Sequence, residues 1–199
     1  VLNLKPDNHE YKVMGLAAYS KKEYTKKLFN ELLNLQDVKG INFIFNKKPK
    51  DLYFFLQKIS KGERFDNIAG AVQYYTEYLC KKFVRNAVNI SKINNVCFAG
   101  GVAMNVKSNL VISKERKISR FYVPFAPDDN SLSIGACYIT QKNNINKFNS
   151  NFKNKKISNP YIGLSSEMKN RDNYIFKIFK NKKYKIHKTQ INNIASKLL

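Results

Sequence analysis

Two adjacent glycines mark the first place where this sequence could do chemistry. Gly100 and Gly101 lie between an apolar, strand-like segment and a helical pattern. Paired glycines let a backbone approach a ligand without obstruction, and the amides at the start of a helix favour an anion, so a nucleotide would fit here. A turn that only packs the helix on the sheet explains the pair equally well, because neither GxGxxG nor GxxxxGK[ST] is present. Asn105, about one helical turn past Gly101, could point toward the same ligand or lie in solvent.

A pair of carboxylates lies at the next junction between a strand and a helix. Asp128 and Asp129 follow Pro127, where open α/β sheets tend to bind ligands. A carboxylate there can bind a divalent metal ion or orient a nucleophile. It can also cap the next helix, which contributes about 1 kcal/mol. Because two acids and Asn130 exceed what one cap needs, Asp128 or Asn130 could cap the helix while the other carboxylate does chemistry. Both interpretations stand at this point.

A third block, residues 10–19, reads Glu-Tyr-Lys-Val-Met-Gly-Leu-Ala-Ala-Tyr. Lys12 and Met14, just before Gly15, could line a pocket. Met14 could instead fill a core, which is the more common use of methionine. We predict that residues 1–20 form a loop that carries this block.

The elements that must position these residues alternate between helix and strand. The longest predicted helix has Asp66 as its N-cap and repeats apolar residues at spacings of three and four. A helix between two strands, next to the glycine pair and the carboxylates, indicates an α/β fold. The predicted helices are 21–35, 50–58, 66–88, 103–113 and 133–141, and the predicted strands are 41–45, 95–99 and 121–125.

The charge of the chain needs an explanation. Its 199 residues include 36 Lys and Arg against 14 Asp and Glu, a net charge of +22. Such a charge could serve nucleic acid, since each neutralised phosphate releases counterions. Only five of the cations are arginines, although phosphate and base recognition favours the planar arginine fork, and the lysine pairs are dispersed. We therefore favour a compositional origin in AT-rich codons and keep nucleic acid as the less favoured partner.

Composition also bounds the setting of the protein. Hydrophobic residues make up 43% of the chain, and no apolar run approaches the roughly 20 residues of a membrane helix, so we expect a core and no membrane partner. Cys80, Cys97 and Cys137 are too widely spaced for a CxxC metal site or a disulfide framework, which suits a reducing cytoplasm. The start at Val1 and the end within a helical pattern predict a fragment.

Taken together, four blocks in this order resemble the O-carbamoyltransferases of the NodU/CmcH type. The blocks are residues 10–19, 66–73, 99–105 and 127–136, and four ordered blocks are far more specific than any one of them. The resemblance covers roughly residues 1–140. Residues 159–163, Asn-Pro-Tyr-Ile-Gly, resemble the start of that family's C-terminal domain.

The resemblance implies a domain organisation. Residues 1–141 correspond to the second lobe of an ATPase fold of the actin, sugar-kinase and heat-shock-chaperone type. Residues 142–158, rich in Asn, Lys and Ser, correspond to a linker, and residues 159–199 to the truncated start of a YrdC-like C-terminal α/β domain. Ser131 and Leu164 depart from the glycine and proline usual in the family.

The resemblance also implies a function. Family enzymes use ATP and a metal ion, usually iron, to carry a carbamoyl group from carbamoyl phosphate, through carbamoyl-adenylate, to a hydroxyl of a small acceptor such as a sugar or an antibiotic. Asp129 matches the family's carboxylate ligand to the metal. The residues that match the nucleotide-side loop and the border of its cleft are Lys12, Met14, Gly15, Gly100, Gly101, Val102 and Asn105.

Parts of the family's active site are expected outside this sequence. The paired histidines of the metal site and the first lobe's phosphate loop are expected before Val1, and the carbamoyl-phosphate site after Leu199. The chain alone is therefore expected to show no ATP-dependent carbamoyl transfer, and turnover by the purified chain would contradict the fragment interpretation.

Two other functions stay open on the sequence. The related tRNA threonylcarbamoyl-adenosine transferases share the Ala-Gly-Gly-Val-Ala-x-Asn block and an Asp-Asn pair, and tRNA would use the positive charge. A noncatalytic basic module that binds RNA is the third interpretation. The Lys-Val-Met-Gly-Leu-Ala segment and residues 159–163 favour the enzyme that acts on a small molecule.

Overall fold

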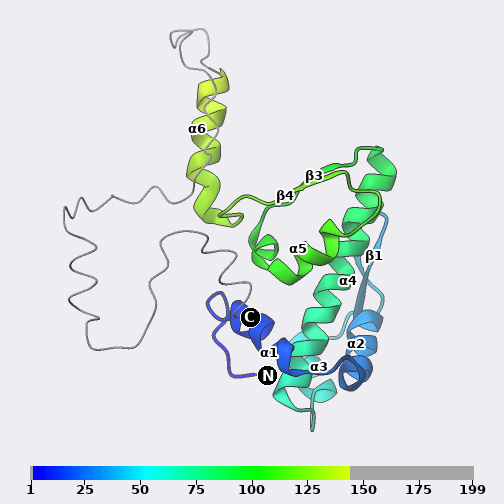
Figure 1. Ribbon diagram of the computed structural model, residues 1–199. Helices are drawn as coiled ribbons and strands as arrows, with labels where there is room; N and C mark the ends of the chain where they lie inside the picture. The colour runs from blue at the N-terminus through cyan, green and yellow to red at the C-terminus, as the bar shows by residue number, and fades with distance from the viewer. Residues whose placement is uncertain (1, 144–199) are drawn as a thin grey trace, which may run out of the picture. The chain divides into compact units, whose positions relative to one another are not determined.

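The computed structural model describes residues 2–143, so almost all of the predicted linker and the whole predicted C-terminal domain lie outside the described residues. Within that range the fold is mixed α/β, with helices around two small sheets (Figure 1), which confirms the fold class at this level. The elements, with η for a 3-10 helix, are α1 (Glu10–Leu16), η1 (Ala17–Tyr19), α2 (Lys22–Leu35), β1 (Gln36–Lys39), β2 (Asn42–Phe45), α3 (Leu52–Ile59), α4 (Phe65–Ser91), β3 (Asn95–Cys97), η2 (Gly101–Met104), α5 (Val106–Ser113), β4 (Arg120–Tyr122), η3 (Asp129–Ser131) and α6 (Leu132–Asn143).

Helix α4 packs against α2 and β1 on one side and against α5 on another, as Figure 1 shows. Its N-terminal half contributes Ala71 to a cluster with Leu28 and Leu32 of α2. Its C-terminal half contributes residues that pack on Ile112 of α5, and these are Cys80, Val84 and Val88. Buried residues therefore recur along α4 from Asp66 to Val88, whereas the apolar repeat that the sequence predicted is only partly buried.

The start of α4 makes a close approach to the segment before it. A Cβ atom on Gly70 would lie 2.7 Å from the Cβ of Ser20 and 2.9 Å from the Cγ2 of Thr25. The Ser20 hydroxyl donates a hydrogen bond of 2.9 Å to the Asn67 side chain. Only glycine lets the backbones come this close, so η1 and the start of α2 are held directly on α4.

Residues 95–122 fold as a strand, helix, strand unit. β3 and β4 pair in parallel, with Asn95 opposite Arg120 and Cys97 opposite Tyr122, and α5 lies between them in the sequence. This confirms the predicted alternation. The helix begins later than predicted, at Val106 instead of residue 103, because residues 101–104 form the tighter turn η2.

The first sheet contains a strand that the sequence did not predict. β1, Gln-Asp-Val-Lys, has a single apolar residue, Val38, and pairs antiparallel with β2. Side chains of α4 hold this hairpin in place. The Tyr75 hydroxyl donates to the Gln36 carbonyl over 2.8 Å, and the Lys82 ammonium lies 2.6 Å from the Asp37 carboxylate. These long-range contacts, not local propensity, define β1.

Two predictions about helix starts were wrong. Residues 10–19 form α1 and η1 instead of a loop. The Glu10 carboxylate accepts a hydrogen bond of 2.6 Å from the Asp7 amide, and α1 packs on α4, which stabilises a helix too short to persist alone. Asp66 is not the N-cap of α4, because the helix begins at Phe65 with Arg64 as its N-cap; Asp66 lies in the first turn, paired with Arg64 at 3.0 Å.

No helix among residues 2–143 combines the length and the apolar character that crossing a bilayer requires.

Replacing Gly70 by alanine should destabilise the fold, because the new methyl group would overlap Ser20 and Thr25. We expect Gly70→Ala to lower the free energy of unfolding by about 1–3 kcal/mol in urea denaturation. Gly135→Ala in α6 is the matched control, since a Cβ there meets no atom within 4 Å. An equal, small effect of the two substitutions would contradict the close approach.

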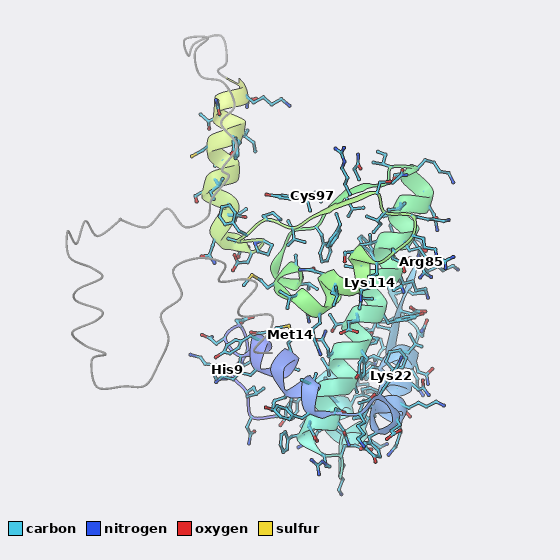
Figure 2. The ribbon with its side chains drawn as sticks, viewed as in Figure 1. His9, Met14, Lys22, Arg85, Cys97 and Lys114 are labelled. Atoms are coloured by element: carbon cyan, nitrogen blue, oxygen red, sulfur yellow. The ribbon has the colours of Figure 1, made fainter. Side chains whose placement is uncertain are left out.

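Acid should weaken the attachment of α5 to α4. Hydrogen bonds from Arg85 lower the pKa of Glu115 from its ordinary 4.5 to about 2, against burial and with help from Lys81. Figure 2 labels Arg85 on α4 and Lys114, the residue before Glu115. A lowered carboxylate pKa adds stability above pH 4.5 that is lost as the pH falls toward 2. We expect Glu115→Gln to flatten the dependence of unfolding free energy on pH in this window. An unchanged dependence in the variant would show that other carboxylates cause the loss of stability in acid.

Candidate functional site

The loops that follow β3 and β4 lie side by side. Because the two strands are parallel, their carboxyl ends meet at the same edge of the sheet. The Gly100 amide donates a hydrogen bond of 2.6 Å to the Pro127 carbonyl, and the Phe98 amide donates one of 2.9 Å to the Tyr122 carbonyl. The structure therefore brings the glycine pair and the carboxylate pair together, as their positions after successive strands predict.

The two glycines have different reasons to be glycine. Gly100 has φ of +104°, a backbone conformation that residues with a side chain rarely adopt. Gly101 has no such φ. A Cβ atom on either residue would meet no atom within 4 Å. The space beside both residues is open, which a ligand approaching the backbone requires.

The residues after the glycine pair alternate between solvent and core. Val102 is 53% exposed, and Met104 is similarly exposed, whereas Ala103 is buried. The Ala103 amide donates to the Gly100 carbonyl over 2.9 Å, which closes the turn. Val102 therefore presents its side chain on the same open loop as the glycines, where the family resemblance places a nucleotide-side residue.

Asn105 is neither free nor solvated, which corrects the alternative of a solvent-facing helix residue. It is the N-cap of α5, and its side-chain oxygen accepts a hydrogen bond of 3.0 Å from the Ser108 amide. Its amide group also exchanges two hydrogen bonds with the Gln73 side chain, of 2.8 and 3.1 Å. The side chain of Asn105 is therefore committed to α5 and α4 in this conformation.

The two carboxylates, Asp128 and Asp129, differ in their hydrogen bonds. Asp128 is the N-cap of η3 and accepts hydrogen bonds from the amide and side chain of Asn130, at 3.2 and 2.7 Å. Asp129 is exposed, and its carboxylate forms no hydrogen bond or ion pair with the residues that the structure describes. Of the two possibilities that the sequence left open, the structure assigns capping to Asp128 and leaves Asp129 available.

Asp129 fits the predicted metal ion as one ligand of an incomplete set. Its free oxygens suit a hard or borderline divalent cation. Within residues 2–143, however, no group of three His, Cys, Asp or Glu side chains could hold a metal ion together. Any metal bound by Asp129 would need ligands other than these.

Lys12, Met14 and Gly15 all lie on α1, which packs on α4. Lys12 and Met14 are half-buried, and Gly15 is exposed. Val13, between the two side chains, lines a pocket of about 270 Å³ with Val72 of α4. Gln73, which follows Val72 on α4, forms the hydrogen bonds to Asn105. The pocket beside α1 and the contact between α4 and Asn105 therefore involve neighbouring residues of one helix. The predicted role of the three residues stays a prediction.

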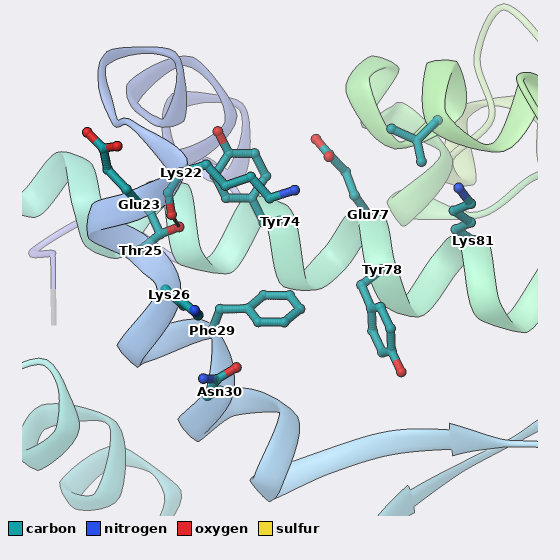
Figure 3. A pocket seen from close by; sticks show the side chains of 11 residues that line it. Lys22, Glu23, Thr25, Lys26, Phe29, Asn30, Tyr74, Glu77, Tyr78 and Lys81 are labelled. Atoms are coloured by element: carbon teal, nitrogen blue, oxygen red, sulfur yellow. Dashed lines mark hydrogen bonds between the residues drawn. The ribbon is translucent and has the colours of Figure 1, made fainter.

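A larger pocket of about 630 Å³ lies between α2 and α4, bordered by α5 (Figure 3). Aromatic rings and lysine ammonium groups line it, and none of the predicted site residues does. The side chains shown there include Lys22, Lys26, Phe29, Tyr74, Tyr78 and Lys81. Its nearest link to the loops is Glu77, whose carboxylate accepts a hydrogen bond of 2.8 Å from Gln73.

Comparison with known proteins places this arrangement in a family. Residues 1–138 match the family described as carbamoyltransferase N-terminus. The chain belongs to the carbamoyltransferase N-terminus family. The match spans all four sequence blocks and both loops at the sheet edge, and it confirms the resemblance on which the sequence interpretation relied. It also favours this family over the interpretation as a related tRNA-modifying transferase.

Relatives of this carbamoyltransferase N-terminal domain occur in distant organisms. The chain is 27% identical to nodulation protein NolO of Bradyrhizobium diazoefficiens, over 64% of the chain and 24% of the relative. It is 28% identical to an uncharacterized protein of Synechocystis, over 66% and 24%, and 29% identical to one of Methanocaldococcus jannaschii, over 84% and 31%. The alignments therefore cover between about a quarter and a third of these relatives' length.

Sequence reasoning missed two polar residues of α4, Gln73 and Glu77. Gln73 is 3% exposed, and its amide lies between Asn105 and Glu77. A signal was present, because Gln73 ends the second of the four blocks and interrupts a run of small, apolar residues on a helix. A buried amide needs partners, and no partner can be named before the fold is known.

The two glycines should respond differently to substitution. Gly100→Ala should lower the free energy of unfolding by about 1–3 kcal/mol, because alanine is strained at the φ of +104° and ψ of 167° that Gly100 adopts. Gly101→Ala should leave it nearly unchanged, since the added methyl group meets no atom within 4 Å. Thermal and urea unfolding of both variants check this difference; equal effects would contradict the loop conformation.

Proposed function

We propose that the protein carrying this chain transfers a carbamoyl group from carbamoyl phosphate, by way of carbamoyl-adenylate, to a hydroxyl of a small acceptor, with ATP and a divalent metal ion. Membership of the carbamoyltransferase N-terminus family supports the general activity. The observation that carries the finer proposal is the hydrogen bond of 2.6 Å between Gly100 and Pro127, because it places an open glycine loop beside a free carboxylate. We also propose that this domain is the second lobe of an ATPase fold.

In this proposal each loop has its own task. The backbone of Gly100 and Gly101 would lie against the nucleotide, since no side chain obstructs that approach. Val102, exposed on the same turn, would contact the nucleotide with its apolar side chain. Lys12, Met14 and Gly15 of α1 would border the cleft.

Asp129 would hold the metal ion, which is iron by family resemblance. Asp128 would keep Asp129 in place, because its two hydrogen bonds to Asn130 shape the turn η3 that contains Asp129. A bound metal supplies positive charge that polarises a carbonyl and offsets the charge of phosphate groups. The chain's own contribution is a hydrogen-bonded turn with a carboxylate that forms no hydrogen bond or ion pair with a described residue.

A binding experiment tests the metal role of Asp129. Calorimetric titration of the full-length protein that carries this chain with a nonhydrolysable ATP analogue, with and without iron(II) in the absence of oxygen, measures how far the metal strengthens nucleotide binding. We expect Asp129→Asn to lose at least about tenfold of that metal-dependent affinity, because the neutral amide is a poor ligand. Asp128→Asn removes the same charge one residue away but keeps one side-chain oxygen to accept the hydrogen bond from the Asn130 amide, so it should keep most of the effect.

Two results would contradict this proposal. Equal metal-dependent binding by Asp129→Asn and the unsubstituted protein would remove Asp129 from the metal site. Failure of the unsubstituted protein to bind the ATP analogue at millimolar concentration, with metal present, would remove the nucleotide role of the glycine loop.

A further inference from the structure

We infer that Gln73 is a positioning residue that holds the loop from Gly100 to Asn105 in its conformation, acting through the side chain of Asn105. The importance of this loop for nucleotide rests on the proposed function. The positioning itself rests on the hydrogen bonds between α4 and the start of α5.

The contact between the two side chains is reciprocal. The Asn105 amide nitrogen donates to the Gln73 oxygen over 2.8 Å, and the Gln73 amide nitrogen donates to the Asn105 oxygen over 3.1 Å. Two antiparallel bonds between planar amides define the orientation of both groups, which one bond would not do. The second N–H of Gln73 donates to Glu77 over 2.8 Å, so the buried amide of Gln73 is fully engaged.

Asn105 passes this orientation on to the loop. Its side-chain oxygen caps α5 through the Ser108 amide at 3.0 Å, and its own backbone amide donates to the Val102 carbonyl at 3.0 Å. A rotation of the Asn105 side chain would break the cap of α5. The backbone of Asn105 would then be less restrained, and its amide bond to the Val102 carbonyl, which closes η2, would open more easily. The orientation that Gln73 imposes on Asn105 therefore reaches the backbone of Val102, two residues after Gly100.

This arrangement changes the role expected of Asn105. Its side chain faces α4 and α5, and three hydrogen bonds occupy it. We therefore assign Asn105 to the conformation of the loop and not to direct contact with a nucleotide. Gln73 and Asn105 end the second and third sequence blocks, and their contact gives a physical reason for the two blocks to occur together.

Hydrogen exchange of the full 199-residue chain tests the inference. Gln73→Leu keeps the size of the side chain and removes all three of its hydrogen bonds. We expect the amides of Ala103, Asn105 and Ser108 to exchange about tenfold faster, relative to the amide of Val84 in the core of α4. Arg85→Gln is the matched control, because it weakens a contact between the same two helices at the far end of α5, and it should leave these three amides unchanged relative to Val84.

A double-substitution cycle separates positioning from general packing. If Gln73 acts through Asn105, the variant with both Gln73→Leu and Asn105→Ala should exchange no faster than Asn105→Ala alone. Additive effects would overturn the inference, as would unchanged exchange in Gln73→Leu. Gln73→Glu keeps the acceptor for Asn105 but loses both donated bonds, and it serves if the leucine variant does not fold; its loop should also exchange faster.

Nucleotide titration of the full-length protein that carries this chain, with the same substitutions, tells the two proposals apart. Weaker binding of the ATP analogue by Gln73→Leu, together with faster loop exchange, supports both. Faster exchange in Gln73→Leu, with no binding of the analogue by the unsubstituted full-length protein, supports the positioning role and contradicts the proposed function. Unchanged exchange in Gln73→Leu contradicts the positioning role whatever the titration gives.

Discussion

Helix α4 must be buried on two faces at once, and the other described elements that shape the site depend on this constraint. Its N-terminal half packs on α2 and carries α1, while its C-terminal half packs on α5 below the parallel strands. Apolar burial supplies most of the attachment, because it is roughly proportional to area and needs no special geometry. Gly70 shows how tightly the first of these faces is packed.

Polar contacts from the same helix then set details that burial leaves undefined. Arg85 joins α4 to the end of α5 through Glu115, and Gln73 joins it to the start of α5 through Asn105. Nonpolar packing would allow α5 to slide or rotate slightly, whereas paired hydrogen bonds allow one register. The position of the glycine loop is therefore tied to α4 at a defined point, two residues after Ala71 of the first apolar cluster.

The candidate site follows from the geometry of parallel strands. Two strands that run the same way place their following loops at one edge, so Gly100 and Pro127 meet although they are distant in the sequence. Capping then distinguishes two neighbouring carboxylates, because Asp128 serves η3 and Asp129 stays free of described partners. All four sequence blocks fall within the residues that match the family, so the loops at this edge of the sheet belong to the part of the chain that matches the family's N-terminal domain.

The sequence by itself determined the family, the long helix, the alternation of strand and helix, and the places where chemistry could occur, because periodicity and motif order are local properties. It did not determine β1, whose single apolar residue gives no signal, or α1, which is stable only against α4. It also could not decide between Asp128 and Asp129 or find the partner of Gln73. Those choices depend on hydrogen bonds between residues far apart in the chain, and only the tertiary structure brings such groups within bonding distance.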